Sequence, residues 1–266
     1  IRFGKTPVSA KVLQWLKHAN IETWHVDLNA GTYHSRHVSR AILMPPRDFL
    51  RQAKVVLSEE QQAFETNWQL INQKDKQLVH EMAIVSALNR AVSPKTPIFV
   101  ANSMPIRDMD DFFTGFNTQT IYANRGANGI DGVISTALGM SVTTKQRSLL
   151  LTGDLTLFHD MNGLMMARNY QLPLDIIVID NNGGGIFSFL PQAEATEYFE
   201  TLFGTPLELD ISKIASLYQL SYVLLKQPED LRKVLNQPTD GTRIIVYPSN
   251  RTQNVRDHQK YIGESL

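Results

Sequence analysis

Apolar and polar positions follow a regular rhythm along most of this chain. Short apolar runs rich in β-branched residues predict six buried strands, at residues 97–102, 119–124, 148–154, 175–182, 221–225 and 242–250. Helical spacing of apolar residues predicts helices at 78–92, 125–143, 157–170, 194–202, 211–218 and 228–235, the second of them entered through a glycine-rich turn. Apolar strands that alternate with helices form parallel sheets covered on both faces, so we predict an α/β fold with a doubly wound parallel sheet.

The first quarter of the chain has a different pattern. A short β-rich start, a helix around 12–16 and a strand at 23–28 are followed by two prolines and a charged helical stretch at 58–77. We place a domain boundary near residue 60, which gives domains 1–60 and 61–266. Because the opening residues read as joining a domain already under way, we expect the chain to be the C-terminal part of a longer protein.

Composition narrows the class of function. Lys+Arg and Asp+Glu are both 26 in 266 residues, so the net charge is zero and nothing in it suggests a nucleic-acid partner. The absence of cysteine removes disulfides and thiolate metal sites. No apolar run approaches the ~18 residues that a membrane span needs. We therefore expect a cytoplasmic globular protein.

Polar residues stand at the predicted carboxyl ends of two successive strands. Asp154 ends one strand, and Asn181, Asn182 and Gly183 end the next. Open α/β sheets bind ligands at this edge, where neighbouring strand ends converge. A carboxylate, an amide oxygen and a backbone carbonyl are hard oxygen ligands that suit Mg²⁺, which completes its shell with phosphate oxygens and water. The pattern therefore predicts a metal–diphosphate site at these two strand ends.

The residues that follow Gly153 are suited to the phosphate. Backbone N–H groups at the start of a helix form an anion site, and here they belong to Gly153, Asp154, Leu155 and Thr156. In the alternative interpretation the glycines only shape turns and Asp154 caps a helix. No glycine-rich dinucleotide motif opens a helix after a strand and no P-loop sequence occurs, which disfavours a Rossmann dehydrogenase or a P-loop enzyme.

The same motifs resemble a known family. "GD" followed by "NN" is similar to the thiamine diphosphate (ThDP) motif, although Leu155 stands where the usual sequence has glycine. The blocks "NSMPIRD" (102–108), "NRGANGIDG" (124–132), "GDLTLFHDMNGL" (153–164) and "NNGGGIFSFLPQ" (181–192) resemble the 2-succinyl-5-enolpyruvyl-6-hydroxy-3-cyclohexene-1-carboxylate synthases, ThDP enzymes of menaquinone biosynthesis. "IRFGKTPVS" resembles the late part of that family's middle domain, so the resemblance covers nearly the whole chain.

This resemblance implies a domain arrangement and a reaction. Family members have a pyrimidine-binding N-terminal domain, a middle domain and a diphosphate-binding C-terminal domain. Residues 1–60 would be the end of the middle domain with a linker, and 61–266 the diphosphate- and Mg²⁺-binding domain. The implied activity is a transketolase-type transferase reaction with ThDP and Mg²⁺, or Mn²⁺ in its place. It decarboxylates 2-oxoglutarate and adds the succinyl unit to isochorismate.

The resemblance also implies what this chain lacks. In the family, the glutamate that activates ThDP belongs to the N-terminal domain and is supplied across the interface of a homodimer or homotetramer. No residue of 1–266 matches it, so we expect the chain to be inactive alone.

Several positions match functional residues of the family. Asp154, Asn181 and the Gly183 carbonyl match its Mg²⁺ ligands. Ile130 matches the apolar residue that props the two rings of the cofactor into their bent conformation. A branched side chain beside glycines offers a rigid wedge, although an ordinary core isoleucine would look the same.

A second group of positions matches the substrate side of the family's site. Ser103, Arg107 and Arg125 match positions that hold carboxylates and hydroxyls, and fork-shaped arginine donors suit two dicarboxylate substrates. The alternative is that these arginines form surface salt bridges. Ile186 and Phe187 match apolar positions that line the reaction cavity, where exclusion of water favours carbanion chemistry. They would serve equally well to anchor a loop on the core.

Two other functions stay open. Another ThDP enzyme, acetolactate-synthase-like or a decarboxylase, would share the metal motif, but enzymes for monocarboxylates lack the set formed by Ser103, Arg107 and Arg125. A non-catalytic binding or regulatory module could share the fold, and it would not bind ThDP with Mg²⁺.

Overall fold

The chain forms two compact units, Ile1–Lys76 and Gln77–Leu266. The computed structural model describes residues 1–4, 9–28, 38–54, 56–72, 78–115 and 119–263. The boundary expected near residue 60 falls inside helix α3 (Glu59–Asn72), which belongs entirely to the first unit. The assignment of the two units to a middle domain and a diphosphate domain stays a prediction.

The first unit contains a small parallel sheet with strands in the order β1-β2-β3. The strands are β1 (Arg2–Phe3), β2 (Trp24–Asp27) and β3 (Arg40–Leu43). The helices that accompany α3 are α1 (Ala10–His18) and α2 (Pro46–Gln52). Helix α1 begins after Ser9, whose hydroxyl accepts the Val12 N–H, and α2 begins at a proline, which a first helical turn tolerates.

The second unit is built on a six-stranded sheet in the order β5-β4-β6-β7-β9-β8, and every pairing in it is parallel. Its strands are β4 (Pro97–Val100), β5 (Thr120–Tyr122), β6 (Ser148–Gly153), β7 (Leu174–Asp180), β8 (Ser221–Leu224) and β9 (Arg243–Pro248). Each coincides with a run predicted from the sequence, and only β7 begins earlier than predicted, at Leu174. The predicted α/β fold with a doubly wound parallel sheet is therefore confirmed.

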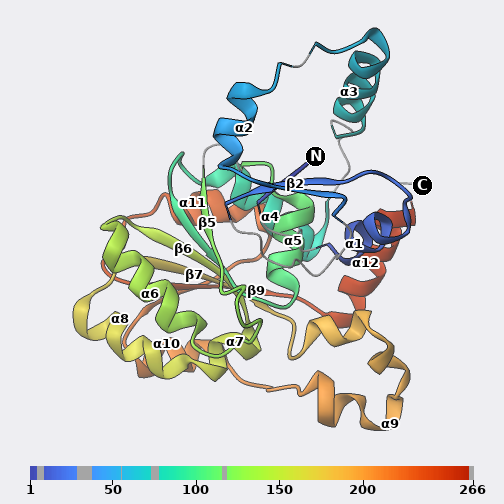
Figure 1. The fold of residues 1–266 in the computed structure, drawn as a ribbon. Coiled ribbons are helices and arrows are strands. Elements are labelled where there is room, and N and C mark those ends of the chain that lie inside the picture. Colours follow the sequence, from blue (N-terminus) through green and yellow to red (C-terminus); the bar gives the residue numbers. More distant parts are fainter. Residues whose placement is uncertain (5–8, 29–37, 55, 73–77, 116–118, 264–266) are drawn as a thin grey trace. The chain divides into compact units, whose positions relative to one another are not determined.

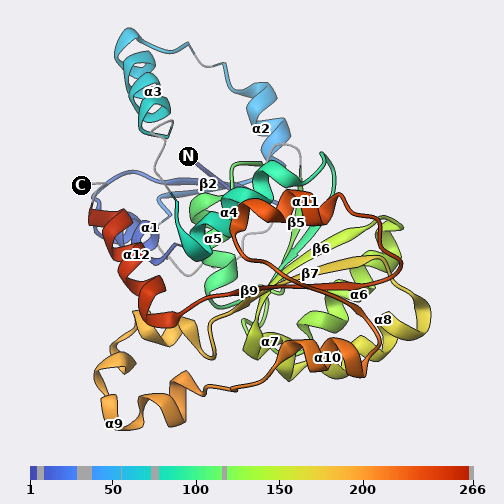
Figure 2. The same ribbon diagram turned by 180° about the vertical axis from the view of Figure 1, so that it is seen from behind.

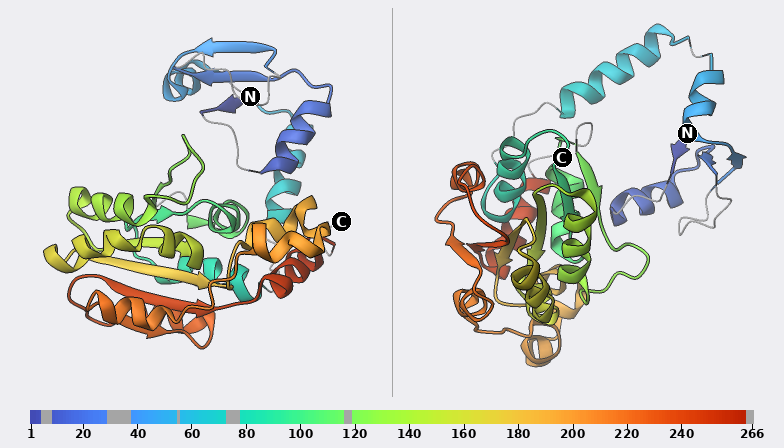
Figure 3. Two further views of the ribbon diagram at one scale, coloured as in Figure 1. Left: turned by 90° about the horizontal axis from the view of Figure 1, so that it is seen from below. Right: turned by 90° about the vertical axis from the view of Figure 1, so that its left-hand side faces the viewer.

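Helices cover both faces of this sheet. Figures 1 and 2 show one layer on each side, and Figure 3 (left) shows the first layer from below. That first layer consists of α6 (Val133–Thr144), α8 (Leu164–Tyr170) and α10 (Ile211–Leu217). The second consists of α4 (His80–Ala91), α5 (Met104–Phe112) and α11 (Leu231–Leu235). Both faces are thus removed from water, as the continuous apolar strands require.

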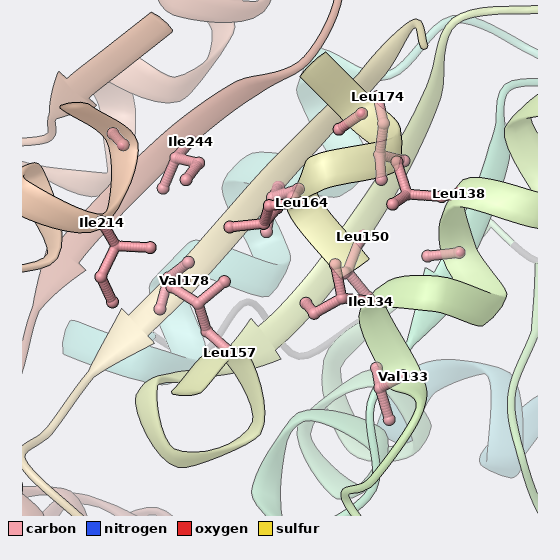
Figure 4. Close-up of a cluster of buried hydrophobic side chains, with 14 of the residues drawn as sticks. Val133, Ile134, Leu138, Leu150, Leu157, Leu164, Leu174, Val178, Ile214 and Ile244 are labelled. Atoms are coloured by element: carbon pink, nitrogen blue, oxygen red, sulfur yellow. The ribbon is translucent and has the colours of Figure 1, made fainter. Parts of the chain in front are cut away.

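The hydrophobic core under the first layer is shown in Figure 4. Ile134 and Leu138 of α6 belong to one buried cluster with Leu150, Val178 and Ile244 from three adjacent strands. Each such side chain contributes roughly 1.5–3 kcal/mol through its burial. Successive residues of a strand point to opposite faces, so the alternate residues face the second layer. These residues are Leu149, Leu151, Ile177, Ile179 and Ile245, which are equally buried.

The order of the strands creates a switch point between β4 and β6. From β4 the chain crosses to β5 on one side, then returns to form β6 on the other side of β4. The loops that leave β4 and β6 therefore diverge from adjacent carboxyl ends. In open α/β sheets such a point is a crevice where ligands bind.

Two predicted helices are interrupted. The one expected at 157–170 is divided into α7 (Asp154–His159), a short 3₁₀ turn and α8. The break lies where Gly163 approaches α6 so closely that a Cβ would be 2.7 Å from Ser135 Oγ. The one expected at 194–202 becomes α9 (Thr196–Phe199) followed by a π-helical turn at Glu200–Gly204. At Gly163 the contact with α6 outweighs helical periodicity.

Helix α5 and the last helix, α12 (Arg251–Gly263), were not predicted. Pro105 lies in the first turn of α5, where the missing N–H would have no helical partner in any case. Both helices carry groups that reach the candidate site. Among the described residues, no helix is long and apolar enough to cross a membrane.

Candidate functional site

A cavity of about 360 Å³ lies at the carboxyl ends of β4, β6 and β7, beside the switch point. Its size falls in the range typical of small-molecule sites. Every residue that was predicted to bind the cofactor, the metal or the substrates, or to line the reaction cavity, lines this cavity: Ser103, Arg107, Arg125, Ile130, Gly153, Asp154, Leu155, Thr156, Asn181, Gly183, Ile186 and Phe187. The fold thus brings together residues from loops far apart in the sequence, and the role of each stays a prediction.

Asp154 connects the ends of β6 and β7. It is 5% exposed and occupies the first position of α7, after Gly153. One carboxylate oxygen accepts the Leu155 N–H at 2.8 Å, and the other accepts the Gly183 N–H at 2.7 Å. Burial raises the pKa of Asp154 to about 6, and the two backbone donors offset only part of that rise. A cation beside this carboxylate would favour its ionised form.

Asn181 offers an oxygen without a partner. Its side-chain Nδ2 donates to Glu81 Oε1 at 3.1 Å, whereas its Oδ1 is buried and has no hydrogen-bond partner in the described part of the chain. A buried polar atom of this kind normally has a partner. The described part of the chain therefore does not supply a partner for this oxygen.

Gly183 completes this group of oxygens. It has a φ of 132°, and a Cβ at this position would overlap the Gly204 carbonyl oxygen, so the loop requires glycine. A carboxylate, an unpaired amide oxygen and a carbonyl fit the ligand preferences of Mg²⁺. No group of three His, Asp or Glu suited to a metal occurs within the described ranges, so an ion held here would rely on this mixed set.

The two predicted substrate arginines lie on the β4 side of the cavity. Arg107 of α5 donates to the Ser103 carbonyl at 2.5 Å, and Arg125 donates to Asn102 Oδ1 at 2.6 Å. Asn102 also binds the Asn124 and Gly129 carbonyls and so fixes the loop that carries Arg125. Burial lowers the pKa of Arg107, and the charge of Arg125 lowers it further. Two like charges kept close in this way provide an attractive position for an anion.

The remaining predicted residues form an apolar wall. Ile130, Ile186 and Phe187 are half-buried and line the cavity. Phe187 lies in a 3₁₀ turn (Gly185–Phe189) and its ring packs against Phe203 at 5.5 Å between centroids. The ring of Phe203 thus anchors Phe187, part of which lines the cavity.

A buried acid that the sequence analysis missed also lines the cavity. Glu81 of α4 is 2% exposed and receives hydrogen bonds from Asn181, Ser249 and Asn254. Burial raises the pKa of Glu81 to about 7, and the neighbouring charge of Asp108 adds to this rise. The sequence pattern that could have indicated this buried acid is its position directly before the apolar stretch at 82–85.

A buried histidine–aspartate pair lies close to Glu81. His258 Nε2 of α12 is 3.0 Å from Asp108 Oδ1 of α5, and His258 Nδ1 is 2.9 Å from the Asn254 carbonyl. Burial raises the pKa of Asp108, and the bond from His258 opposes that rise. Burial lowers the pKa of His258, but Asp108 outweighs this and leaves it above its ordinary value. The pair links α12 to the helix that carries Arg107.

Comparison with known families identifies the class of protein that has this site. Residues 108–246 match the family described as thiamine pyrophosphate enzyme, C-terminal TPP binding domain. The match covers more than half of the chain, which therefore belongs to the thiamine pyrophosphate enzymes.

Within that class, the chain is similar to one kind of enzyme. It is 64% identical, over 98% of its length, to the 2-succinyl-5-enolpyruvyl-6-hydroxy-3-cyclohexene-1-carboxylate synthase of Leuconostoc mesenteroides subsp. mesenteroides, and 56% identical to that of Leuconostoc citreum over the same share. The synthase of Oceanobacillus iheyensis is 41% identical over 97% of the chain. The resemblance seen in the motifs is confirmed. The chain spans about half the length of these relatives, 48%, 48% and 47% in turn.

Proposed function

We propose that this chain is the diphosphate-binding part of a synthase that decarboxylates 2-oxoglutarate and adds the succinyl unit to isochorismate, in menaquinone biosynthesis. The observation that carries the proposal is one cavity lined by Asp154 and Asn181 on one side and by Arg107 and Arg125 on the other. Two fixed guanidinium groups beside a metal–diphosphate site suit a reaction between two dicarboxylates. Identity of 64% to a synthase named for the product supports the same reaction.

The cofactor and metal would be held by the strand ends. Asp154 Oδ1 and Oδ2, Asn181 Oδ1 and the Gly183 carbonyl are the oxygens available to Mg²⁺, with Mn²⁺ as a substitute ion. Gly153, Leu155 and Thr156 line the part of the cavity suited to the diphosphate. When bound, ThDP supplies the stabilisation of a carbanion that a decarboxylation of this type requires.

The other residues would orient substrate and exclude water. Arg107 and Arg125 bind and orient carboxylates, with Ser103 beside them. Ile130 supports the cofactor, and Ile186 and Phe187 keep water from the reacting carbon. These roles make the enzyme a transferase that forms a carbon–carbon bond.

The proposal also covers the oligomeric state of the enzyme and its location in the cell. The enzyme would be a cytoplasmic homodimer or homotetramer in which the part of the relatives that this chain does not span supplies the glutamate that activates ThDP. The chain from 1 to 266 would then show no turnover by itself. Turnover by a preparation of residues 1–266 that contains no longer form would refute this part of the proposal.

The test uses the full-length gene product with ThDP, Mg²⁺, 2-oxoglutarate and isochorismate, with isochorismate loss and product mass as readouts. We expect product formation, its loss in Asp154→Ala, and unchanged activity in Asp131→Ala, because Asp131 is exposed and does not line the cavity. Consumption of pyruvate with isochorismate untouched would instead favour an acetolactate-synthase-like enzyme or a decarboxylase. Absence of ThDP binding would favour a non-catalytic module.

A further inference from the structure

The two ends of the Asn181 amide have different surroundings. Its Nδ2 faces a carboxylate oxygen of Glu81 at 3.1 Å, and its Oδ1 is buried at the cavity with no partner among the described residues. An amide has one donating end and one accepting end, so the group that faces the first end decides what the second end offers. The group that fixes Nδ2 therefore also determines that Oδ1 faces the cavity.

Glu81 is itself fixed by the structure around it. Its Oε1 accepts the Ser249 hydroxyl at 2.7 Å in addition to Asn181 Nδ2, and its Oε2 accepts Asn254 Nδ2 at 2.9 Å. These donors come from three elements, the loop after β7, the loop after β9 and α12. A side chain that is 2% exposed and receives three donors has a single position, and as a carboxylate it acts as an acceptor at both oxygens.

We propose that Glu81 is a positioning residue for the cation site and that it holds the Asn181 amide with its oxygen toward the cavity. The inference rests on the proposed function, because the cation is part of that proposal. Without a carboxylate at position 81, the amide can rotate by half a turn and present its NH₂ group, which repels a cation. Groups that orient metal ligands commonly affect metal affinity about 10- to 100-fold.

The experiment measures Mn²⁺ binding to the full-length gene product at pH 8 in the presence of ThDP, from the electron paramagnetic resonance signal of free Mn²⁺. In Glu81→Gln we expect the apparent Kd for Mn²⁺ to rise about 10- to 100-fold, because a glutamine amide can face Asn181 with either end. Asp257→Asn is the matched control. Asp257 is a buried carboxylate of α12 that bonds His80 of α4 but does not contact Asn181, so the Kd should change less than about twofold.

A second variant separates orientation from general damage. In Glu81→Gln/Asn181→Asp the ligand is a carboxylate, which has an oxygen on either side and needs no orientation. The introduced glutamine amide can then donate to one of these oxygens while the other faces the cation. We expect this double variant to bind Mn²⁺ at least about fivefold more tightly than Glu81→Gln alone.

The outcomes distinguish this inference from the proposed function. If the unaltered protein fails to bind Mn²⁺ with ThDP, the proposed function falls and the inference with it. If the unaltered protein binds but Glu81→Gln binds equally well, or if the double variant gives no recovery, only the inference is overturned. If circular dichroism shows that Glu81→Gln is unfolded, Glu81→Asp takes its place. This variant keeps the acid but is too short to reach Asn181, and an unchanged Kd in it would overturn the inference.

Discussion

The carboxylate of Asp154 and the backbone N–H of Gly183 are joined by a hydrogen bond of 2.7 Å across 29 residues of sequence. This bond ties the end of β6 to the end of β7, which are paired along their length. The proposed metal ligands are thus held together by the loop backbone before any ion arrives. Such preorganisation reduces the cost of binding.

Asp154→Asn keeps the size of the side chain but replaces one oxygen by an NH₂ group. That group opposes either the Leu155 N–H or the Gly183 N–H, and it also removes one oxygen from the proposed ligand set. We expect the affinity for ThDP with Mg²⁺ to fall at least about 100-fold. Isothermal titration calorimetry measures it, and binding of unchanged strength would show that Asp154 is not a ligand.

Gly183→Ala tests the loop itself. With a φ of 132° and a Cβ position that overlaps the Gly204 carbonyl oxygen, alanine forces both loops apart. We expect the free energy of unfolding to fall by more than about 2 kcal/mol. In the control Gly126→Ala the added Cβ meets no atom within 4 Å, so the change should stay within about 0.5 kcal/mol. Urea denaturation compares the two, and equal stabilities would contradict the close approach.

The raised pKa of Glu81 predicts a pH dependence of stability. The pKa of this side chain goes from 4.5 to about 7 on folding, so between these values the folded state keeps a proton that the unfolded state has released. Stability is therefore fully present below about pH 4.5 and is lost as the pH rises through 7, by up to about 3 kcal/mol from this group. Urea denaturation at pH 5 and pH 8, without ThDP or metal, measures the loss.

Glu81→Gln provides the comparison for this pH dependence. The variant should lose less stability between pH 5 and pH 8 than the unaltered protein does. Asp154, whose pKa is raised to about 6, contributes in the same direction to both proteins and cancels in the difference. An identical loss in the two proteins would show that Glu81 ionises in the folded state as it does in the unfolded chain.

Arg107→Ala tests the substrate side of the proposed function. Loss of a charge-assisted hydrogen bond to a carboxylate costs about 1.5–3 kcal/mol, so we expect KM for the dicarboxylate it binds to rise about 10- to 150-fold. Arg168→Ala removes an exposed arginine of α8 that does not line the cavity and should leave KM unchanged. Steady-state kinetics on the full-length gene product decides, and equal KM values in the two variants would remove Arg107 from the substrate site.

An ion triad around a buried carboxylate, at the opposite ends of the strands, should affect the stability of the protein and not its ligand binding. Asp175 is 2% exposed and accepts bonds from Arg147 and Arg243, both at 2.8 Å. Asp175→Asn leaves two guanidinium groups without their charge partner and should cost about 3–5 kcal/mol. Thermal or urea denaturation measures this loss, while ThDP affinity at a temperature where the variant is folded should not change. A loss of affinity would connect the triad to the site.

The strands and the residues at their ends could be predicted from the sequence because each depends on local patterns. A strand buried on both faces is apolar throughout, and its last polar residue marks the carboxyl end, as at Asp154 and Asn181. Parallel pairing then brings these ends to one edge without further information. Arg107 and Arg125 could be assigned to the site only with the family resemblance, because a single arginine in a loop belongs to no local sequence pattern.

The contribution of α12 could not be predicted in this way. Its sequence is mostly polar, and the residues that it buries in the described part of the chain include Asn254, Asp257 and His258, which make hydrogen bonds, while the His258 ring also packs against Phe112 and Phe189. A search for apolar periodicity therefore does not find this helix. The partner of Asn254 is Glu81, 173 residues away, and no local pattern specifies such a contact.

The order β7-β9-β8 has a consequence for the growing chain. Strand β8 leaves the ribosome before β9, the strand that must lie between it and β7. A nascent chain arrested before residue 243 should therefore leave β8 open to protease, and protection should appear once β9 and α12 have emerged. Asn254 reaches Glu81 at the same late stage. The Asn181 amide is thus secured only after the strands that carry the site have been synthesised.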